Sequence, residues 1–206
     1  MYLIGLTGNF GTGKTTVSKI LAELGVSIIN TDELGHQILG NNYQVRDELV
    51  AAFGTEILNT NGGIDRKRLG ETAFKSKWGT SLLNQIMHPR ITQAISEKIE
   101  AFARDKKNVV VIEATLIDTS YWIYKVDEMW VTTAPQDVII NRLKGERGYN
   151  ETEVLDRLQR QVPPGDIINL ADVLIDTDCT LQELQKNVTE LWQQLITSIP
   201  QLEDGI

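Results

Sequence analysis

Residues 8 to 15 carry the pattern with the clearest chemistry, because Gly8-Asn9-Phe10-Gly11-Thr12-Gly13-Lys14-Thr15 satisfies G-x-x-x-x-G-K-[ST]. The glycines let successive backbone N–H groups face one anion at the N-terminus of a helix. Lys14 is expected to reach the β- and γ-phosphates, and Thr15 has the hydroxyl that this motif offers to Mg²⁺. We predict a site for a nucleoside triphosphate with Mg²⁺, formed by Gly8, Asn9, Phe10, Gly11, Thr12, Gly13, Lys14, Thr15 and Thr16.

The residues around the motif support this prediction. Tyr2 to Leu6 is a short apolar run typical of a buried strand, and apolar residues at helical spacing follow the motif from Val17 to Leu24. A strand, a glycine-rich loop and a helix in this order are the setting that a phosphate-binding loop requires. The alternative, a glycine-rich turn without function, is therefore disfavoured.

A carboxylate follows the second predicted strand, Val26 to Ile29. In a parallel sheet the carboxyl ends of neighbouring strands meet at the ligand crevice, and Asp32 lies two residues past Asn30, the expected strand end. A carboxylate there can accept the proton of an attacking hydroxyl. The alternative is that Asp32 caps a helix beginning at Glu33. We predict a catalytic Asp32, because capping does not exclude catalysis.

Glu113 ends the apolar run Val109 to Ile112, as an acidic residue of the Walker B type would. In that position it could hold a water molecule on Mg²⁺. The alternative is an ordinary surface carboxylate at the end of a strand.

Five cations occur in a later stretch with two predicted helices and a Gly145 to Gly148 connection: Arg142, Lys144, Arg147, Arg157 and Arg160. We interpret residues 142–165 as a lid that brings cations to a phosphoryl group and excludes water, and we expect Arg142 and Arg147 to act in catalysis. A solvated helical pair is the alternative, because nearby carboxylates nearly balance these charges.

Five short apolar segments separated by helical patterns predict an α/β fold with a parallel sheet covered on both faces. The predicted strands are Tyr2 to Leu6, Val26 to Ile29, Val109 to Ile112, Met129 to Val131 and Val173 to Ile175. The pattern between them predicts several helices, including Tyr43 to Phe53, one after Asp65 and a long one after Pro89. We assign residues 1–32 and 108–206 to a core and residues 33–107 to a helical insertion.

Composition limits the remaining function classes. The chain has 206 residues, and 20 Lys and Arg against 28 Asp and Glu give a formal charge of −8, which disfavours binding to nucleic acid or an anionic membrane. The longest aliphatic run, Val109 to Ile112, is far too short to span a bilayer. With no secretory pattern after Met1 and one cysteine, Cys179, a cytosolic protein is expected. These features do not set an oligomeric state.

With these residues placed, the whole chain resembles the dephospho-CoA kinases. The shared motifs are Gly5-Leu6-Thr7-Gly8 before the loop, Leu24-Gly25 with Ile29-Asn30-Thr31-Asp32, Phe53-Gly54 with Ile57-Leu58, Ile64-Asp65-Arg66, His88-Pro89-Arg90-Ile91, Arg142-Leu143, Gln161 and Ala171-Asp172-Val173-Leu174-Ile175-Asp176. The His-Pro pair is the most telling outside the loop, because general nucleotide kinases do not carry it.

The resemblance implies a three-layer P-loop kinase fold with a helical substrate-binding insertion and a short lid. It implies transfer of the γ-phosphoryl of ATP to the 3′-hydroxyl of dephospho-CoA, the last step of coenzyme A synthesis. Asp32 would be the base, and Arg66 and His88 would lie near the acceptor. For His88 the alternative is a backbone hydrogen bond at a helix start before Pro89.

Several positions depart from the family pattern. Asn30 stands where the family has a first Asp, and Thr177 stands where an Asn near the adenine is expected. Arg147 is one step later than the second lid arginine, and the acidic residue expected within residues 115–119 is displaced. The aromatic cluster of Tyr121, Trp122 and Tyr124 could pack in the core or contact the substrate.

Two other functions therefore stay open. One is a related P-loop kinase acting on a nucleoside monophosphate or another small hydroxyl acceptor, and the other is an ATP-binding protein with weakened catalysis. A GTPase is disfavoured, because the chain lacks the base-reading N-K-x-D segment.

Overall fold

The computed structural model describes residues 1–115, 126–147, 149–159 and 161–199, with the side chains of Glu146 and Arg147 outside that description. The aromatic cluster of Tyr121, Trp122 and Tyr124, most of the segment 115–119 and the lid cation Arg160 lie outside the described residues. The chain divides into two compact units. One consists of Met1–Asn30 with Ile99–Ile206 and is called the sheet unit, and the other, Thr31–Lys98, is called the helical unit.

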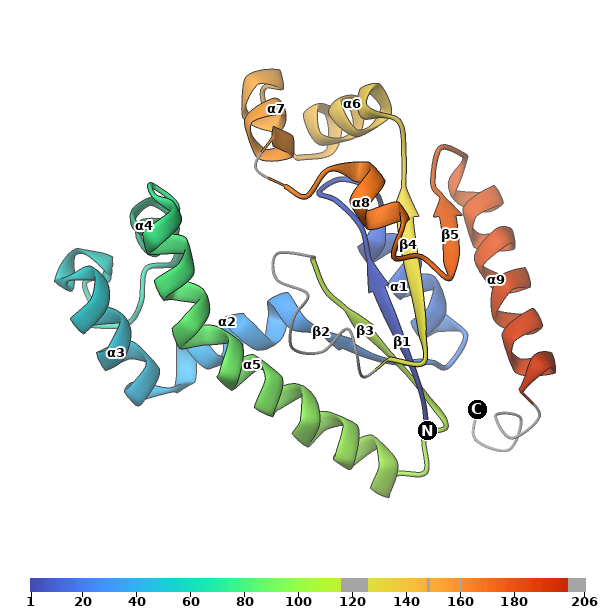
Figure 1. Cartoon of the computed structure of the whole chain (residues 1–206), viewed down its shortest axis with the longest axis horizontal. Helices are drawn as coiled ribbons and strands as arrows, with labels where there is room; N and C mark the ends of the chain where they lie inside the picture. Colours follow the sequence, from blue (N-terminus) through green and yellow to red (C-terminus); the bar gives the residue numbers. More distant parts are fainter. Residues whose placement is uncertain (116–125, 148, 160, 200–206) are drawn as a thin grey trace. The chain divides into compact units, whose positions relative to one another are not determined.

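The sheet unit is built on five parallel strands, β1 to β5. They are β1 (Tyr2–Thr7), β2 (Ser27–Asn30), β3 (Val109–Glu113), β4 (Glu128–Thr133) and β5 (Val173–Asp176), and they lie in the order β2-β3-β1-β4-β5 (Figure 1). The predicted five-stranded parallel sheet is therefore confirmed. β1 lies in the middle, so the loop after it emerges at the centre of the carboxyl edge of the sheet, where ligands bind in this architecture.

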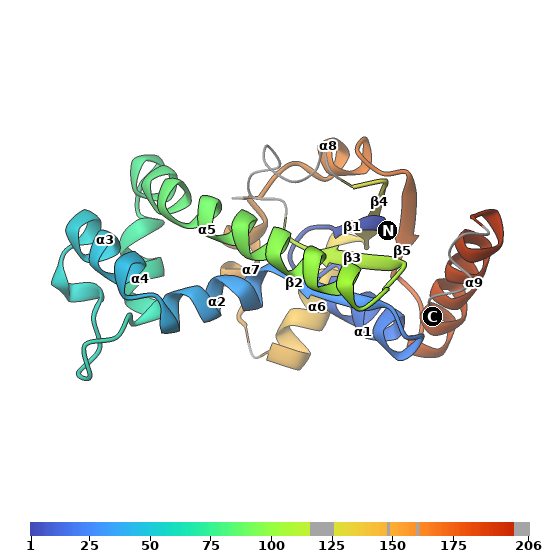
Figure 2. The same cartoon turned by 90° about the horizontal axis from the view of Figure 1, so that it is seen from below.

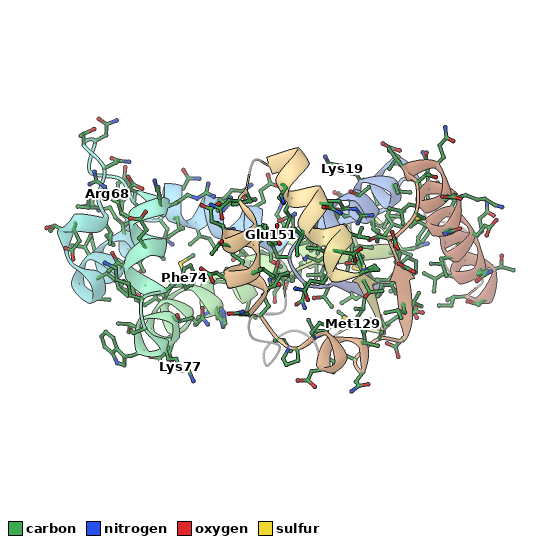
Figure 3. The ribbon with its side chains drawn as sticks, turned by 90° about the horizontal axis from the view of Figure 1, so that it is seen from above. Lys19, Arg68, Phe74, Lys77, Met129 and Glu151 are labelled. Carbon is green, nitrogen blue, oxygen red and sulfur yellow. The ribbon has the colours of Figure 1, made fainter. Side chains whose placement is uncertain are left out.

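Helices cover the sheet on two sides. Figure 2 shows the strands between α1 (Lys14–Glu23) and α8 (Pro164–Ile168). α9 (Leu181–Ser198) lies beside α1, and its Trp192 belongs to one buried cluster with Leu21 of α1 and Trp130 of β4. Met129, labelled in Figure 3, is buried against Ile167 of α8. The sheet thus has an apolar core on both faces, which explains why Val109–Glu113 is buried at every residue.

Two further helices, α6 (Gln136–Arg147) and α7 (Glu151–Gln159), follow β4. The predicted connection from Gly145 is wrong, because Gly145 lies inside α6. Among the described residues no atom lies within 4 Å of the position where a Gly145 Cβ would be, so this glycine is not required for close packing. The predicted capping box before α7 is confirmed, since Asn150 N donates to Glu153 Oε2 at 3.0 Å and Glu153 N donates to Asn150 Oδ1 at 2.9 Å. The box at Thr180 and Glu183 before α9 is also confirmed.

The helical unit contains α2 (Thr31–Asn41), α3 (Tyr43–Phe53), a short 3₁₀ turn (Thr55–Ile57), α4 (Arg66–Ala73) and most of α5 (Lys77–Arg104), which passes the division at Lys98. Its core is separate from that of the sheet unit and contains Leu49, Phe53, Leu69 and Met87. Asp65 caps α4 by accepting hydrogen bonds from the backbone N–H groups of Lys67 and Arg68 at 3.0 and 3.1 Å. Arg68 is labelled in Figure 3.

Helix α5 does not begin after Pro89, as the sequence pattern predicted, but at Lys77. A proline inside a helix removes one N–H donor and disturbs the preceding turn. The Arg90 side chain adds a hydrogen bond in this turn, because its Nη1 donates to the carbonyl of Ile86 at 2.9 Å. The same guanidinium binds both carboxylate oxygens of Glu48 in α3, at 2.6 and 2.7 Å. The helix thus continues through Pro89, and Arg90 anchors this part of it to α3.

Candidate active site at the carboxyl edge of the sheet

The loop after β1 has a backbone that only glycine fits at two of its positions. Gly8 has φ +150°, and a Cβ there would lie 2.3 Å from Thr132 Oγ1. Gly11 has φ +83°, and its Cβ would lie 2.7 Å from Ile139 Cγ2 of α6. Both values are impossible contacts at backbone angles that L-residues rarely adopt. The pattern glycines therefore let the loop lie against β4 and α6.

Buried hydroxyl groups hold this loop in shape. Thr12, only 4% exposed, donates to the carbonyl of Asn9 at 2.7 Å and lies 2.7 Å from the hydroxyl of Thr132. Thr132 is also hydrogen-bonded to the carbonyl of Thr7 at 3.2 Å. The end of β1, the middle of the loop and the end of β4 are thus joined by side chains that solvent does not reach. Such a loop is formed in advance of any ligand.

The loop ends at a helix N-terminus with positive character. Gly13 is in the left-handed conformation and provides no side-chain cap for α1, which begins at Lys14. The first-turn N–H groups of an uncapped helix form an anion site. Lys14 Nζ lies over the same loop and donates to the carbonyls of Gly8 and Asn9 at 2.6 and 3.1 Å. The predicted phosphate-binding groups are therefore assembled around one loop.

Glu113 is not the surface carboxylate of the alternative interpretation. It is 5% exposed and accepts hydrogen bonds from three side chains. Thr15 Oγ1 donates to Oε1 at 2.8 Å, and Ser18 Oγ and Asn30 Nδ2 donate to Oε2 at 2.8 and 2.9 Å. The parallel register aligns Asn30 with Glu113, which brings β2 into this network. Ser18, one turn after Thr15 on α1, is a partner that the sequence analysis missed.

The oxygen atoms at this point fit Mg²⁺. Thr15 is an exposed hydroxyl whose proton is directed to Glu113, so its lone pairs face away from the carboxylate. Among the described residues no group of three or more His, Cys, Asp and Glu side chains could hold a metal ion. Mg²⁺ typically binds through one or two protein oxygens together with substrate phosphates and water, and Thr15 with Glu113 provides such a set.

Thr177, the residue that follows β5, is hydrogen-bonded to three other segments of the chain. It is 1% exposed, and its Oγ1 lies 3.0 Å from the carbonyl of Thr12 and 3.1 Å from the carbonyl of Thr133. Arg142 of α6 donates through Nη1 to the same hydroxyl at 3.0 Å and through Nη2 to the Thr177 carbonyl. The position where the family has an Asn thus holds the loop, β4 and Arg142 together, a role that no sequence pattern indicated.

The segment after α7 also contacts the phosphate loop. The amide of Phe10 donates to Gln161 Oε1 at 2.8 Å, and Asn9 Nδ2 donates to the carbonyl of Val162 at 3.2 Å. These contacts give Gln161, one of the resemblance residues, a physical role. They fix the peptide that follows α7 against two residues of the loop.

The lid cations have different partners. Lys144 pairs with Glu151, labelled in Figure 3, at 3.1 Å. The guanidinium carbon of Arg157 lies 5.2 Å from the centre of the Phe10 ring and 4.6 Å from that of Tyr149. The Arg147 side chain lies outside the described part of the structure. The sequence thus identified the cationic stretch, but it did not indicate which partner each cation contacts.

Asp32 and Arg66 belong to the helical unit, where His36 accompanies them. Asp32 is exposed in the first turn of α2, which begins at Thr31, so the capping alternative for Asp32 is wrong. Arg66 Nη2 donates to His36 Nε2, which places the imidazole proton on Nδ1. Partial desolvation of the ring lowers the pKa of His36 below its ordinary value of 6.5, and the Arg66 charge lowers it further. His36 lies one helical turn after Asp32, a spacing that could have identified it.

His88 is half-buried inside α5. The alternative of a backbone contact at a helix start is therefore wrong, because the helix begins eleven residues earlier, at Lys77.

Across the described residues, no helix is long and apolar enough to span a membrane.

Comparisons with known proteins agree with these features. Residues 2–183 match the family model described as dephospho-CoA kinase. A protein named dephospho-CoA kinase from Dehalococcoides mccartyi is 38% identical over 188 residues, covering 91% of this chain and 94% of that protein.

Solved structures share the fold. The crystal structure of TT1252 from Thermus thermophilus gives a TM-score of 0.80 at 23% identity, covering 94% of this chain and 97% of that one. Dephospho-CoA kinase from Campylobacter jejuni gives a TM-score of 0.71 at 22% identity, covering 95% and 98%. The P-loop kinase fold is thus confirmed. Because the family model extends from the first strand into the last helix, this chain belongs to the dephospho-CoA kinase family.

Proposed function

We propose that this protein transfers the γ-phosphoryl group of ATP to the 3′-hydroxyl of dephospho-CoA, in the cytosol. The observation that carries the proposal is the family match over residues 2–183, because it includes both the phosphate loop and the helical unit. In the reaction the acceptor oxygen bonds to the γ-phosphorus, the bond from that phosphorus to the β–γ bridging oxygen breaks, and ADP leaves.

The loop residues bind the triphosphate in this proposal. The N-terminus of α1 and Lys14 hold the β- and γ-phosphates, while Gly8 and Gly11 let the loop pack against β4 and α6 in the shape that this requires. Thr15 and Glu113, which are hydrogen-bonded to each other, are the residues that would hold Mg²⁺. When bound, the ion neutralises charge on the phosphoryl oxygens. Thr16 follows in the first turn of α1 and completes the predicted set.

Asp32 accepts the proton of the 3′-hydroxyl in this proposal. Its carboxylate is exposed in the first turn of a helix, without a capping bond to occupy it. Arg66 and His88 bind the acceptor substrate, and residues 33–107 form the acceptor-binding part of the chain. Arg142 and Arg147 act from the lid, residues 142–165. The Arg142 guanidinium already has a fixed position through Thr177, so it provides a positive charge of defined direction.

The test is an ADP-release assay with ATP and Mg²⁺ that compares dephospho-CoA, a panel of nucleoside monophosphates and a sample without acceptor. We expect ADP release with dephospho-CoA alone. ³¹P NMR of the product then locates the new phosphate at the 3′-oxygen.

Two outcomes would contradict the proposal. Release with a nucleoside monophosphate and not with dephospho-CoA would indicate a related kinase with another acceptor. Binding of ATP without release for any acceptor would indicate a protein that has lost fast transfer.

A further inference from the structure

We propose that Arg157 is a further lid cation, besides Arg142 and Arg147, that contacts the phosphates of the bound nucleotide, and that Phe10 and Tyr149 hold its guanidinium over the phosphate loop. The inference rests on the proposed function for the reaction, but it concerns nucleotide binding and can be tested without an acceptor. Neither the loop motif nor the spacing of the lid arginines assigns this role to Arg157.

The first observation is the position of the guanidinium. Phe10 is the third residue of the phosphate loop, and the Arg157 guanidinium carbon lies 5.2 Å from its ring centre. The same carbon is 4.6 Å from the ring centre of Tyr149, and the two rings meet edge to face at 5.7 Å. Both distances are within the range of a cation–π contact. Two aromatic rings thus hold one arginine beside a loop built to bind an anion.

The second observation is the anchoring of α7 to the loop. The peptide that follows α7 receives a hydrogen bond from Asn9 and provides one acceptor, Gln161 Oε1, to the amide of Phe10. Arg157 lies four residues before Gln161. The chain just after Arg157 is therefore tied to Asn9 and Phe10, and Phe10 is also the loop residue that the Arg157 side chain approaches, which keeps the guanidinium near the loop.

The third observation is that no carboxylate among the described side chains forms an ion pair with Arg157. Within the part of the chain that the structure describes, Arg157 has no ion pair, although α7 carries Glu151, Glu153 and Asp156. Lys144 forms an ion pair with Glu151, and the Arg142 guanidinium is hydrogen-bonded to Thr177. Arg157 is exposed, and aromatic faces leave the edge of a guanidinium open for hydrogen bonds. A polyphosphate is the partner that this geometry fits, because its oxygens accept two parallel N–H bonds.

The experiment measures affinity for AMP, ADP and ATP, each with Mg²⁺, by titration calorimetry on the full chain. The variants are Arg157→Met, which keeps the apolar stem, and Arg157→Lys, which keeps the charge. Lys144→Met is the matched control, because it removes a lid cation that is already ion-paired. The steady-state ADP-release assay with dephospho-CoA is run in parallel.

We expect Arg157→Met to weaken ATP binding or kcat/KM for ATP about 10-fold or more, the usual range for a hydrogen bond to a charged group. The loss for AMP should be smaller, and Arg157→Lys should recover part of the ATP affinity. Phe10→Leu should change ATP binding in the same direction by a smaller factor, because the guanidinium loses one of its two rings.

Three results would overturn the inference. The first is an Arg157→Met protein that binds ATP with the affinity of the wild type. The second is an Arg157→Met protein whose affinities for AMP and ATP fall by the same factor. The third is a Lys144→Met control whose ATP affinity falls as much as that of Arg157→Met. An equal loss for AMP and ATP would mean that Arg157 only packs the lid. If the wild type binds ATP but does not phosphorylate dephospho-CoA, the proposed function fails while the binding series still tests Arg157.

Discussion

The phosphate loop and the side chains around Asp32 differ in how they are supported. The loop is backed by buried groups, since Thr12, Glu113 and Thr177 are 4%, 5% and 1% exposed and each makes hydrogen bonds to other segments. Asp32, His36 and Arg66, which we call the helical-unit cluster, are exposed, and their one described hydrogen bond joins His36 to Arg66.

The difference indicates which property each region contributes. A network of buried hydrogen bonds fixes geometry and also adds to stability, because each buried group that loses its partner is costly. Exposed side chains add little to stability, and their position adapts to what binds them. We therefore expect changes at the loop to affect folding and nucleotide binding together. Changes in the helical-unit cluster should affect turnover and leave stability at neutral pH nearly unchanged.

The largest expected effect tests the exposed region. Asp32→Asn should lower kcat by about 10²- to 10⁴-fold, the range for a lost general base, while ATP affinity and the melting temperature stay unchanged. Steady-state kinetics and thermal unfolding measure the two quantities. A near-normal kcat would reject Asp32 as the base, and a large drop in melting temperature would remove the contrast between the regions.

Lys14→Ala should lower kcat/KM for ATP by about 10²- to 10³-fold, as for other charged donors to a developing anion. ATP affinity should fall as well, because the side chain is directed over the loop. Calorimetric titration with ATP provides the affinity. Unchanged kinetics would exclude the phosphate-binding role of this loop.

Glu113→Gln tests whether one residue serves both stability and metal binding. The amide nitrogen would replace either the oxygen that accepts from Thr15 or the one that accepts from Ser18 and Asn30, so the free energy of unfolding should fall by about 1–3 kcal/mol. The Mg²⁺ concentration for half-maximal rate should rise severalfold. Denaturant unfolding and a Mg²⁺ titration separate the effects. A loss of stability with an unchanged Mg²⁺ requirement would make Glu113 a structural residue only.

Thr177→Val removes a hydroxyl and keeps the shape. The hydroxyl partners in the loop and Arg142 lose one hydrogen bond each, and we expect unfolding to be easier by about 1 kcal/mol. The KM for ATP should rise only a few fold. Thr177→Ser restores the hydroxyl and serves as the control. A Val variant as stable as the wild type would show that this buried contact does not support the loop.

The smallest effect concerns His36. Because its pKa in the folded state is lowered from 6.5, the unfolded chain takes up the proton first as the pH falls. The His36 contribution is therefore constant above about pH 6.5 and destabilises the fold progressively below it. Unfolding curves from pH 7.5 to 5 for the wild type and His36→Gln should converge at high pH, with the wild type losing more stability on acidification. If the stability of the two proteins changed in parallel over this pH range, protonation of His36 would not contribute to the acid sensitivity of the fold.

The sequence by itself determined the features that depend on neighbours along the chain. The phosphate loop, the five apolar strands and the capping boxes at Asn150 and Thr180 follow from local spacing, since glycine freedom, strand burial and helix caps act within a few residues. The resemblance motifs likewise identified the family correctly. Local rules failed at Pro89, where the helix continues through the proline.

Only the tertiary structure decided which distant residues meet. Glu113 receives donors from Thr15, Ser18 and Asn30 because the parallel register and α1 bring three segments to one point. Thr177 lies 165 residues after Thr12, and Arg157 contacts Phe10 across a comparable stretch of chain. No periodicity relates such residues. Their contacts arise from strand order and helix packing, which depend on the whole core rather than on any local pattern.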